Sequence, residues 1–108
     1  MKGHLDPNIS FLKLLCSASS PQRRQLVRIA NDNQIQSVCE CAHNLLRRNV
    51  SLSPRQIAEL RKHKTLVYKL ADKSIPVAKK RRVLEQSGGG IAAILIPVIS
   101  AIASLFAK

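Results

Sequence analysis

Residues 31–46, NDNQIQSVCECAHNLL, contain the pattern that decides the fold. Apolar side chains recur there at spacings of three and four, which places them on one face of an α-helix. Asn31, Asp32 and Asn33 precede this pattern and can cap a helix N-terminus. The stretch therefore predicts an amphipathic helix whose apolar face is buried against other elements. The residues of that face are Ile35, Val38, Cys39, Ala42, Leu45 and Leu46.

The segments on either side also predict helices. The pairs Ser20-Pro21 and Ser53-Pro54 each predict an N-cap followed by the first helical residue, where proline loses no helical hydrogen bond. The second of these helices is expected to run to about Asp72. Ser10 is expected to cap a short helix before them, and residues 77–86 predict a short basic helix after them.

Strand patterns are missing, because neither period-two alternation nor hairpin dipeptides occur. The fold class is therefore all-α, with a small helical bundle over residues 10–72. A core of this size is thin, so a homo-oligomer or a bound partner would add stability. The residues expected inside are Leu12, Leu15, Leu26, Ile29, Ile35, Val38, Ala42, Leu45, Ile57, Leu60 and Val67.

Composition changes sharply on both sides of this bundle. Residues 1–9 lack periodicity and predict a flexible N-terminus. A basic segment over 73–87 is followed by a glycine hinge at 88–90 and an apolar C-terminal helix or tail over 91–108.

The net charge of +12, from 18 Lys and Arg against six acids, favours an anionic partner such as DNA, RNA or acidic lipid. Trp is absent, and the aromatic residues are one Tyr and two Phe, so base stacking is disfavoured. We expect phosphate contacts instead, because the stretch from Arg55 to Arg82 holds ten Lys or Arg and two acids. The expected contacts are Arg55, Arg61, Lys62, Lys64, Lys69, Lys73, Lys79, Lys80, Arg81 and Arg82.

Three cysteines raise the question of a metal or a nucleophile. Residues two apart on a helix diverge, so Cys39 and Cys41 cannot face one ion together with His43. We expect Cys39 to be a small core residue and Cys41 to be partly exposed. Cys16 completes an odd set of thiols with no secretory signal ahead of it, which favours a reducing compartment. We predict no metal, no cofactor and no enzymatic activity, since the acids are scattered as well.

The tail over 91–107 carries no charge and, at 17 residues, has the minimum length that spans a bilayer. Pro97 near its middle would kink a helix. Membrane association competes here with burial of a terminal helix in an oligomer or against a partner protein. The residues expected to make these contacts are Ile91, Ile94, Leu95, Ile96, Val98, Ile99, Ile102, Leu105 and Phe106.

The last part of the chain resembles a known viral family. A basic block at 79–82, the glycines at 88–90 and the apolar run ILIPVI at 94–99 occur in an order similar to the C-terminal part of adenovirus core protein X, the precursor of the mu peptide. The whole layout also resembles the core-protein-like reading frames of Maverick/Polinton elements and adenovirus-like viruses. The close match covers residues 79–102.

The resemblance implies a basic core protein that binds DNA non-specifically and helps package a genome, located in the virion core and the host nucleus. Capsid proteins, membrane or other copies of the chain would then contact the apolar tail. The alternative is a membrane-active protein whose basic block binds acidic lipid and whose tail inserts. A helical adaptor that docks its tail in a protein groove is a third hypothesis.

Overall fold

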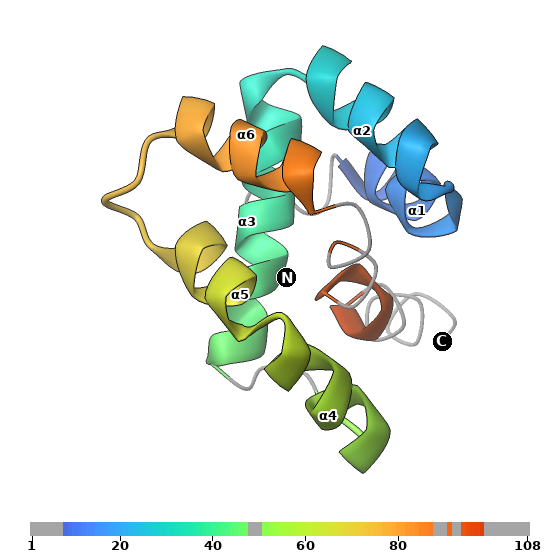
Figure 1. Cartoon of the computed structure of the whole chain (residues 1–108), viewed down its shortest axis with the longest axis vertical. Coiled ribbons are helices and arrows are strands. Elements are labelled where there is room, and N and C mark those ends of the chain that lie inside the picture. The colour runs from blue at the N-terminus through green and yellow to red at the C-terminus, as the bar shows by residue number, and fades with distance from the viewer. Residues whose placement is uncertain (1–7, 48–50, 88–90, 92–93, 99–108) are drawn as a thin grey trace.

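A computed structural model describes residues 8–47, 51–87, 91 and 94–98. These residues form helices and contain no strand, which confirms the all-α prediction. Figure 1 shows the arrangement. The labelled helices are α1 (Ile9–Ser17), α2 (Ser20–Ile29), α3 (Asp32–Leu46), α4 (Pro54–Lys62), α5 (Lys64–Ala71) and α6 (Val77–Gln86). Residues 91 and 94–98 are helical as well.

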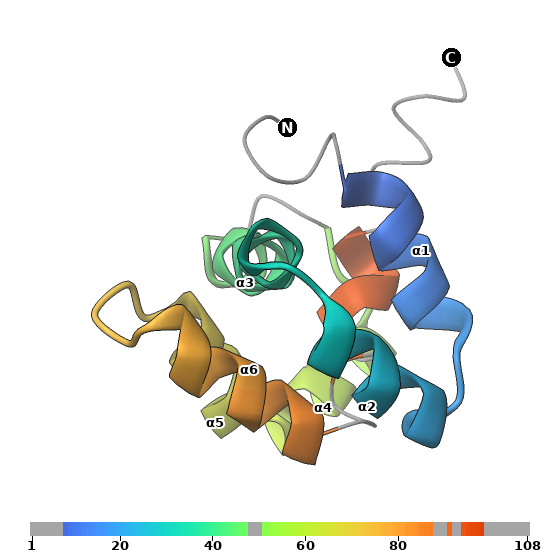
Figure 2. The same ribbon diagram turned by 90° about the horizontal axis from the view of Figure 1, so that it is seen from above.

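Helix α3 is the central element of the bundle. It packs against α1, α5 and α6. Figure 2 shows α5 and α6 on one side of it and α1 on another. The amphipathic pattern that begins at Asn31 predicted this helix and its buried face correctly. Two residues differ from the prediction: Leu46 at the C-terminal end remains 39% exposed, and Cys41 is buried. The buried residues of α3 are Ile35, Ser37, Val38, Cys39, Cys41, Ala42 and Leu45.

Reciprocal capping boxes start α2, α3 and α4. In each, an Asn or Ser side chain accepts the N3 amide while the N3 Gln side chain accepts the N-cap amide. The prediction of Ser53 as the cap of α4 is confirmed. The cap of α2 is Ser19 rather than Ser20, because the reciprocal partner Gln22 lies three residues after Ser19. Likewise α1 is preceded by Asn8 instead of Ser10.

The single helix expected from Pro54 to about Asp72 is in fact two helices. His63 leaves helical geometry, with φ −114° and ψ 25°, and ends α4 just before α5 begins. This break lets α5 lie against α3, while α4 extends to the edge of the molecule (Figure 1). The sequence pattern missed the break because no proline or glycine marks it.

Two residues expected in the core are exposed. Ile29 is 77% exposed, and the buried residues there are Val27 of α2 and its C-cap Ala30. Helix α2 packs against α6. Ile57 on α4 is 39% exposed. Both errors have one cause. Local periodicity indicates that a helix has an apolar face, but it does not specify which neighbouring helices cover that face.

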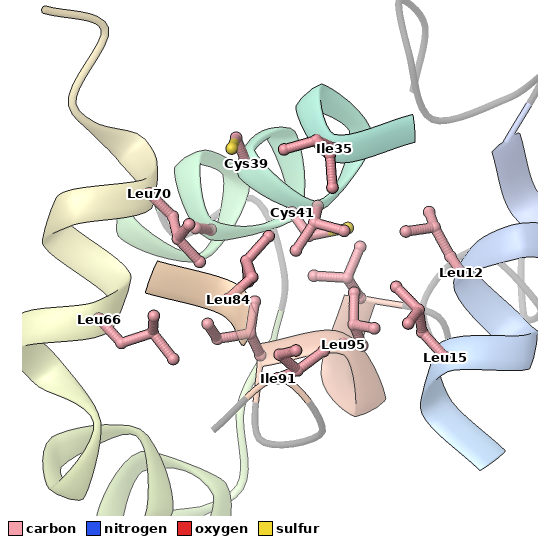
Figure 3. Close-up of a cluster of buried hydrophobic side chains, with 14 of the residues drawn as sticks. Leu12, Leu15, Ile35, Cys39, Cys41, Leu66, Leu70, Leu84, Ile91 and Leu95 are labelled. Carbon is pink, nitrogen blue, oxygen red and sulfur yellow. The ribbon is translucent and has the colours of Figure 1, made fainter. Parts of the chain in front are cut away.

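The hydrophobic core does not end at residue 72. Leu84 of α6, together with Ile91, Ile94, Leu95 and Val98, is fully buried in the same cluster as Leu12 and Leu15. Figure 3 shows Leu84, Ile91 and Leu95 pointing into the space between α1, α3 and α5. The basic segment and the start of the apolar tail therefore form one structural unit with the bundle. The predicted glycine hinge at 88–90 lies outside the described residues.

Candidate nucleic-acid interface

Most of the cations predicted to contact phosphate are at the surface. Of the ten, eight are exposed and two are not. The exposed ones lie on α4, α5 and α6 and on the segment that follows α5. The exposed eight are Arg55, Arg61, Lys62 and Lys64 around the α4–α5 junction, Lys69 and Lys73 at the end of α5, and Lys79 and Arg82 on α6.

Arg81 is held inside the fold. Its Nη1 donates to the carbonyl oxygens of Val27, at 2.8 Å, and Ala30. Its Nη2 makes an ion pair of 3.0 Å with the Asp32 carboxylate, and the side chain is 21% exposed. These bonds join the end of α2 and the start of α3 to α6. The Arg81 guanidinium thus stabilises the helix junction, which leaves it little freedom to contact a phosphate.

Lys80 is the second cation that the fold withdraws from the surface, at 7% exposed. It lines a cavity of about 290 Å³ together with Cys39, Glu40, His43 and Lys73. Among the described residues its side chain makes no hydrogen bond or ion pair.

A polar hollow of about 270 Å³ gathers several of the exposed groups. It lies between the α4–α5 junction and the C-terminal end of α6, with Lys62 and Lys69 on its walls. Lys62 Nζ also makes an ion pair with the Glu59 carboxylate at 3.1 Å. Because this pair is exposed and therefore weak, a phosphate can take the place of the carboxylate. We call this the cationic hollow. Its other lining residues are His63, Thr65, Leu66, Val83, Gln86 and Ser87.

The cysteines are free thiols. Burial raises the pKa of the Cys39 thiol to about 11, against a smaller lowering by Lys80. Burial also raises the pKa of Cys41, which is fully buried and not partly exposed as predicted. Figure 3 shows the two sulfurs on different sides of α3. No cluster of three metal-ligating side chains occurs among the described residues.

The apolar residues predicted to contact membrane or a partner divide into two groups. Ile91, Ile94, Leu95 and Val98 are fully buried, whereas Ile96 is 47% exposed. The described helices include none that is both long and apolar enough to cross a membrane. The rest of the predicted set, Ile99, Ile102, Leu105 and Phe106, lies outside the described residues.

Four exposed cations of the described residues lie outside the predicted set: Lys13 on α1, Arg24 and Arg28 on α2, and Arg47 just after α3. Arg24 and Arg28 are exposed on α2, the helix that packs against α6. Their spacing of four residues places them on one face of the helix, and this signal was present in the sequence.

Comparisons with known proteins identify no relative of this chain. No protein-family model, no curated protein and no solved structure matches this chain.

Proposed function

We propose that this chain is a non-enzymatic, DNA-binding core-like protein of a virus or a virus-derived element, which contacts the DNA backbone without base preference and contributes to genome packaging. The observation that carries the proposal is the set of exposed cations from Arg55 to Arg82, with Lys62 and Lys69 facing the cationic hollow. The resemblance of residues 79–102 to adenovirus core protein X supports it. On this proposal the protein resides in the virion core and the host nucleus.

The binding mode follows from the side chains at the surface. Lysine and arginine neutralise phosphates and release condensed counterions, so affinity falls as salt rises. Tyr68, at 55% exposed, is the aromatic residue of this region, and one ring cannot provide a stacking platform for successive bases. Contacts to phosphate position a protein without reading sequence.

A membrane-active role is the less favoured proposal. In the described conformation the core covers Ile91, Ile94, Leu95 and Val98, so lipid has no access to these four side chains. Insertion of this segment would therefore require opening of the bundle and exposure of its core.

A salt titration with duplex DNA tests the proposal. We compare the full chain with a variant carrying Lys62→Gln, Lys69→Gln and Arg82→Gln, all exposed positions at or next to the cationic hollow. If these three cations contact phosphates, the slope of log affinity against log salt becomes less steep by about 2 to 3.

The matched control removes three exposed cations elsewhere, through Lys13→Gln, Arg24→Gln and Arg28→Gln on α1 and α2. Net charge is then identical in the two variants. A smaller slope change in the control places the interface at the cationic hollow. Equal changes of slope in both variants would show that the interaction depends on net charge alone. If the native chain does not bind duplex DNA, the DNA-binding proposal is wrong.

A further inference from the structure

A second surface, on the other side of α4 and α5, is apolar. It is a hollow of about 280 Å³ between the end of α3, the segment before α4, and helices α4 and α5. We call it the apolar groove. Its lining residues are Leu45, Leu46, Leu52, Ile57, Leu60, Arg61, Lys64, Val67 and Tyr68.

Three large apolar side chains in this groove are exposed together. Leu46 and Ile57 are each 39% exposed, and Tyr68 is 55% exposed. They come from three different helices, so only the tertiary fold gathers them. Single exposed apolar residues are ordinary, but several around one hollow indicate a surface that is covered by a partner.

Helix α4 supports this interpretation independently. It has a capping box and an amphipathic pattern, yet it buries no residue. Its main contact is with α5, its neighbour in the chain. Isolated helices of this length are marginal in water, since most helical stability in proteins comes from packing of an apolar face. The face of α4 that carries Ile57 and Leu60 is therefore incompletely packed in the chain alone.

Charge on the rim selects the partner. Of the described residues, Arg61 and Lys64 are the charged ones that line the groove, while Glu59 of α4 lies in an ion pair with Lys62 and is not among the lining residues. An occupant with carboxylates beside its apolar residues would pair with both cations. A second copy of this chain fits poorly, because each copy has a net charge of +12.

We propose that the apolar groove binds an amphipathic helix of a partner protein, which inserts apolar side chains between α3, α4 and α5 and places flanking carboxylates at Arg61 and Lys64. Helices dock in this way through apolar anchors spaced by three, four and seven residues. The proposal does not depend on DNA binding, since the groove's apolar residues are separate from the cationic hollow.

The test uses the full chain and a labelled synthetic peptide of about four helical turns. The peptide carries leucines at i, i+3, i+4 and i+7, with glutamate and alanine elsewhere. One control peptide replaces each glutamate with lysine. The other keeps the composition but alternates the leucines, which disperses them around a helix. We expect saturable binding of the glutamate peptide and at least about tenfold weaker binding of both controls.

Two isoleucines provide a matched pair of protein variants. Ile57 lines the groove and Ile29 does not, and both are exposed. We expect Ile57→Ser to weaken peptide binding about tenfold or more and Ile29→Ser to leave it unchanged. Ile57→Ser should also leave duplex DNA binding unchanged, which separates the two proposals. Circular dichroism of both variants checks that the fold is retained.

Three results would overturn the proposal. The first is equal binding of the glutamate and lysine peptides, which removes the role of Arg61 and Lys64. The second is equal loss of binding in Ile57→Ser and Ile29→Ser. The third comes from sedimentation: a dimer of the native chain that Ile57→Ser converts to monomer assigns the groove to a second copy instead.

Discussion

Helices α3 and α4 start in the same way and end in different roles. Each begins with a reciprocal capping box, at Asn31 and Ser53, and each has an amphipathic sequence. Yet α3 buries seven residues and α4 buries none. Capping and periodicity thus establish that a helix forms, whereas its neighbours decide whether its apolar face becomes core or remains available to a partner.

The difference in neighbours explains the difference in burial. Helix α3 contacts α1, α5 and α6, and the buried residues of 91–98 join the same core. Helix α4 lies at the edge of the molecule (Figure 1) and contacts mainly α5. The molecule therefore combines a packed region around α3 with an interaction region around α4, and substitutions in the two regions should have different effects.

The largest effect is expected where the tail enters the packed region. Leu95 is fully buried and Ile96, next to it, is 47% exposed. We expect Leu95→Ala to lower the free energy of unfolding by about 2 to 5 kcal/mol, because it leaves a cavity in the core. Ile96→Ala should change it by less than about 1 kcal/mol. Urea denaturation of both variants measures the contrast, and equal small effects would show that 91–98 is not part of the core.

An intermediate effect is expected in the basic block. Arg81→Met removes the bonds to Val27, Ala30 and Asp32 and should cost about 1 to 3 kcal/mol of unfolding free energy. Arg82→Met, at an exposed position, should change stability by about 0.5 kcal/mol or less. Thermal denaturation distinguishes the two.

The same pair of variants sharpens the functional assignment. In a DNA titration at a temperature where both variants are folded, Arg82→Met should reduce affinity more than Arg81→Met does. The reverse order would place Arg81 at the DNA surface and would contradict its structural role.

The smallest effects are expected at the helix caps. Asn31→Ala and Ser53→Ala each remove a side chain that accepts an N3 amide, at a cost of about 1 kcal/mol to the helix concerned. Because α3 is central, Asn31→Ala should lower global stability. Because α4 is peripheral, Ser53→Ala should mainly accelerate amide hydrogen exchange within α4. Slower exchange in α4 than in α3 would contradict the division into two regions.

The sequence by itself determined the helical class, the apolar face of α3, the Ser53 cap and the strong positive charge. These are local properties, since period, capping chemistry and composition are readable over a few residues. The break at His63 escaped prediction because the helix sequence continues through it without a breaker.

Only the tertiary structure decided which of several similar residues serve the core. Four neighbouring cations, Lys79 to Arg82, have nearly the same chemistry, yet packing of α6 on α2 and α3 withdraws Lys80 and Arg81 and leaves the outer two exposed. Tertiary packing also buries Ile91, Ile94, Leu95 and Val98 in the common core, whereas the apolar groove beside α4 stays uncovered. Burial depends on contacts between residues far apart in the chain, and those contacts have no local signature.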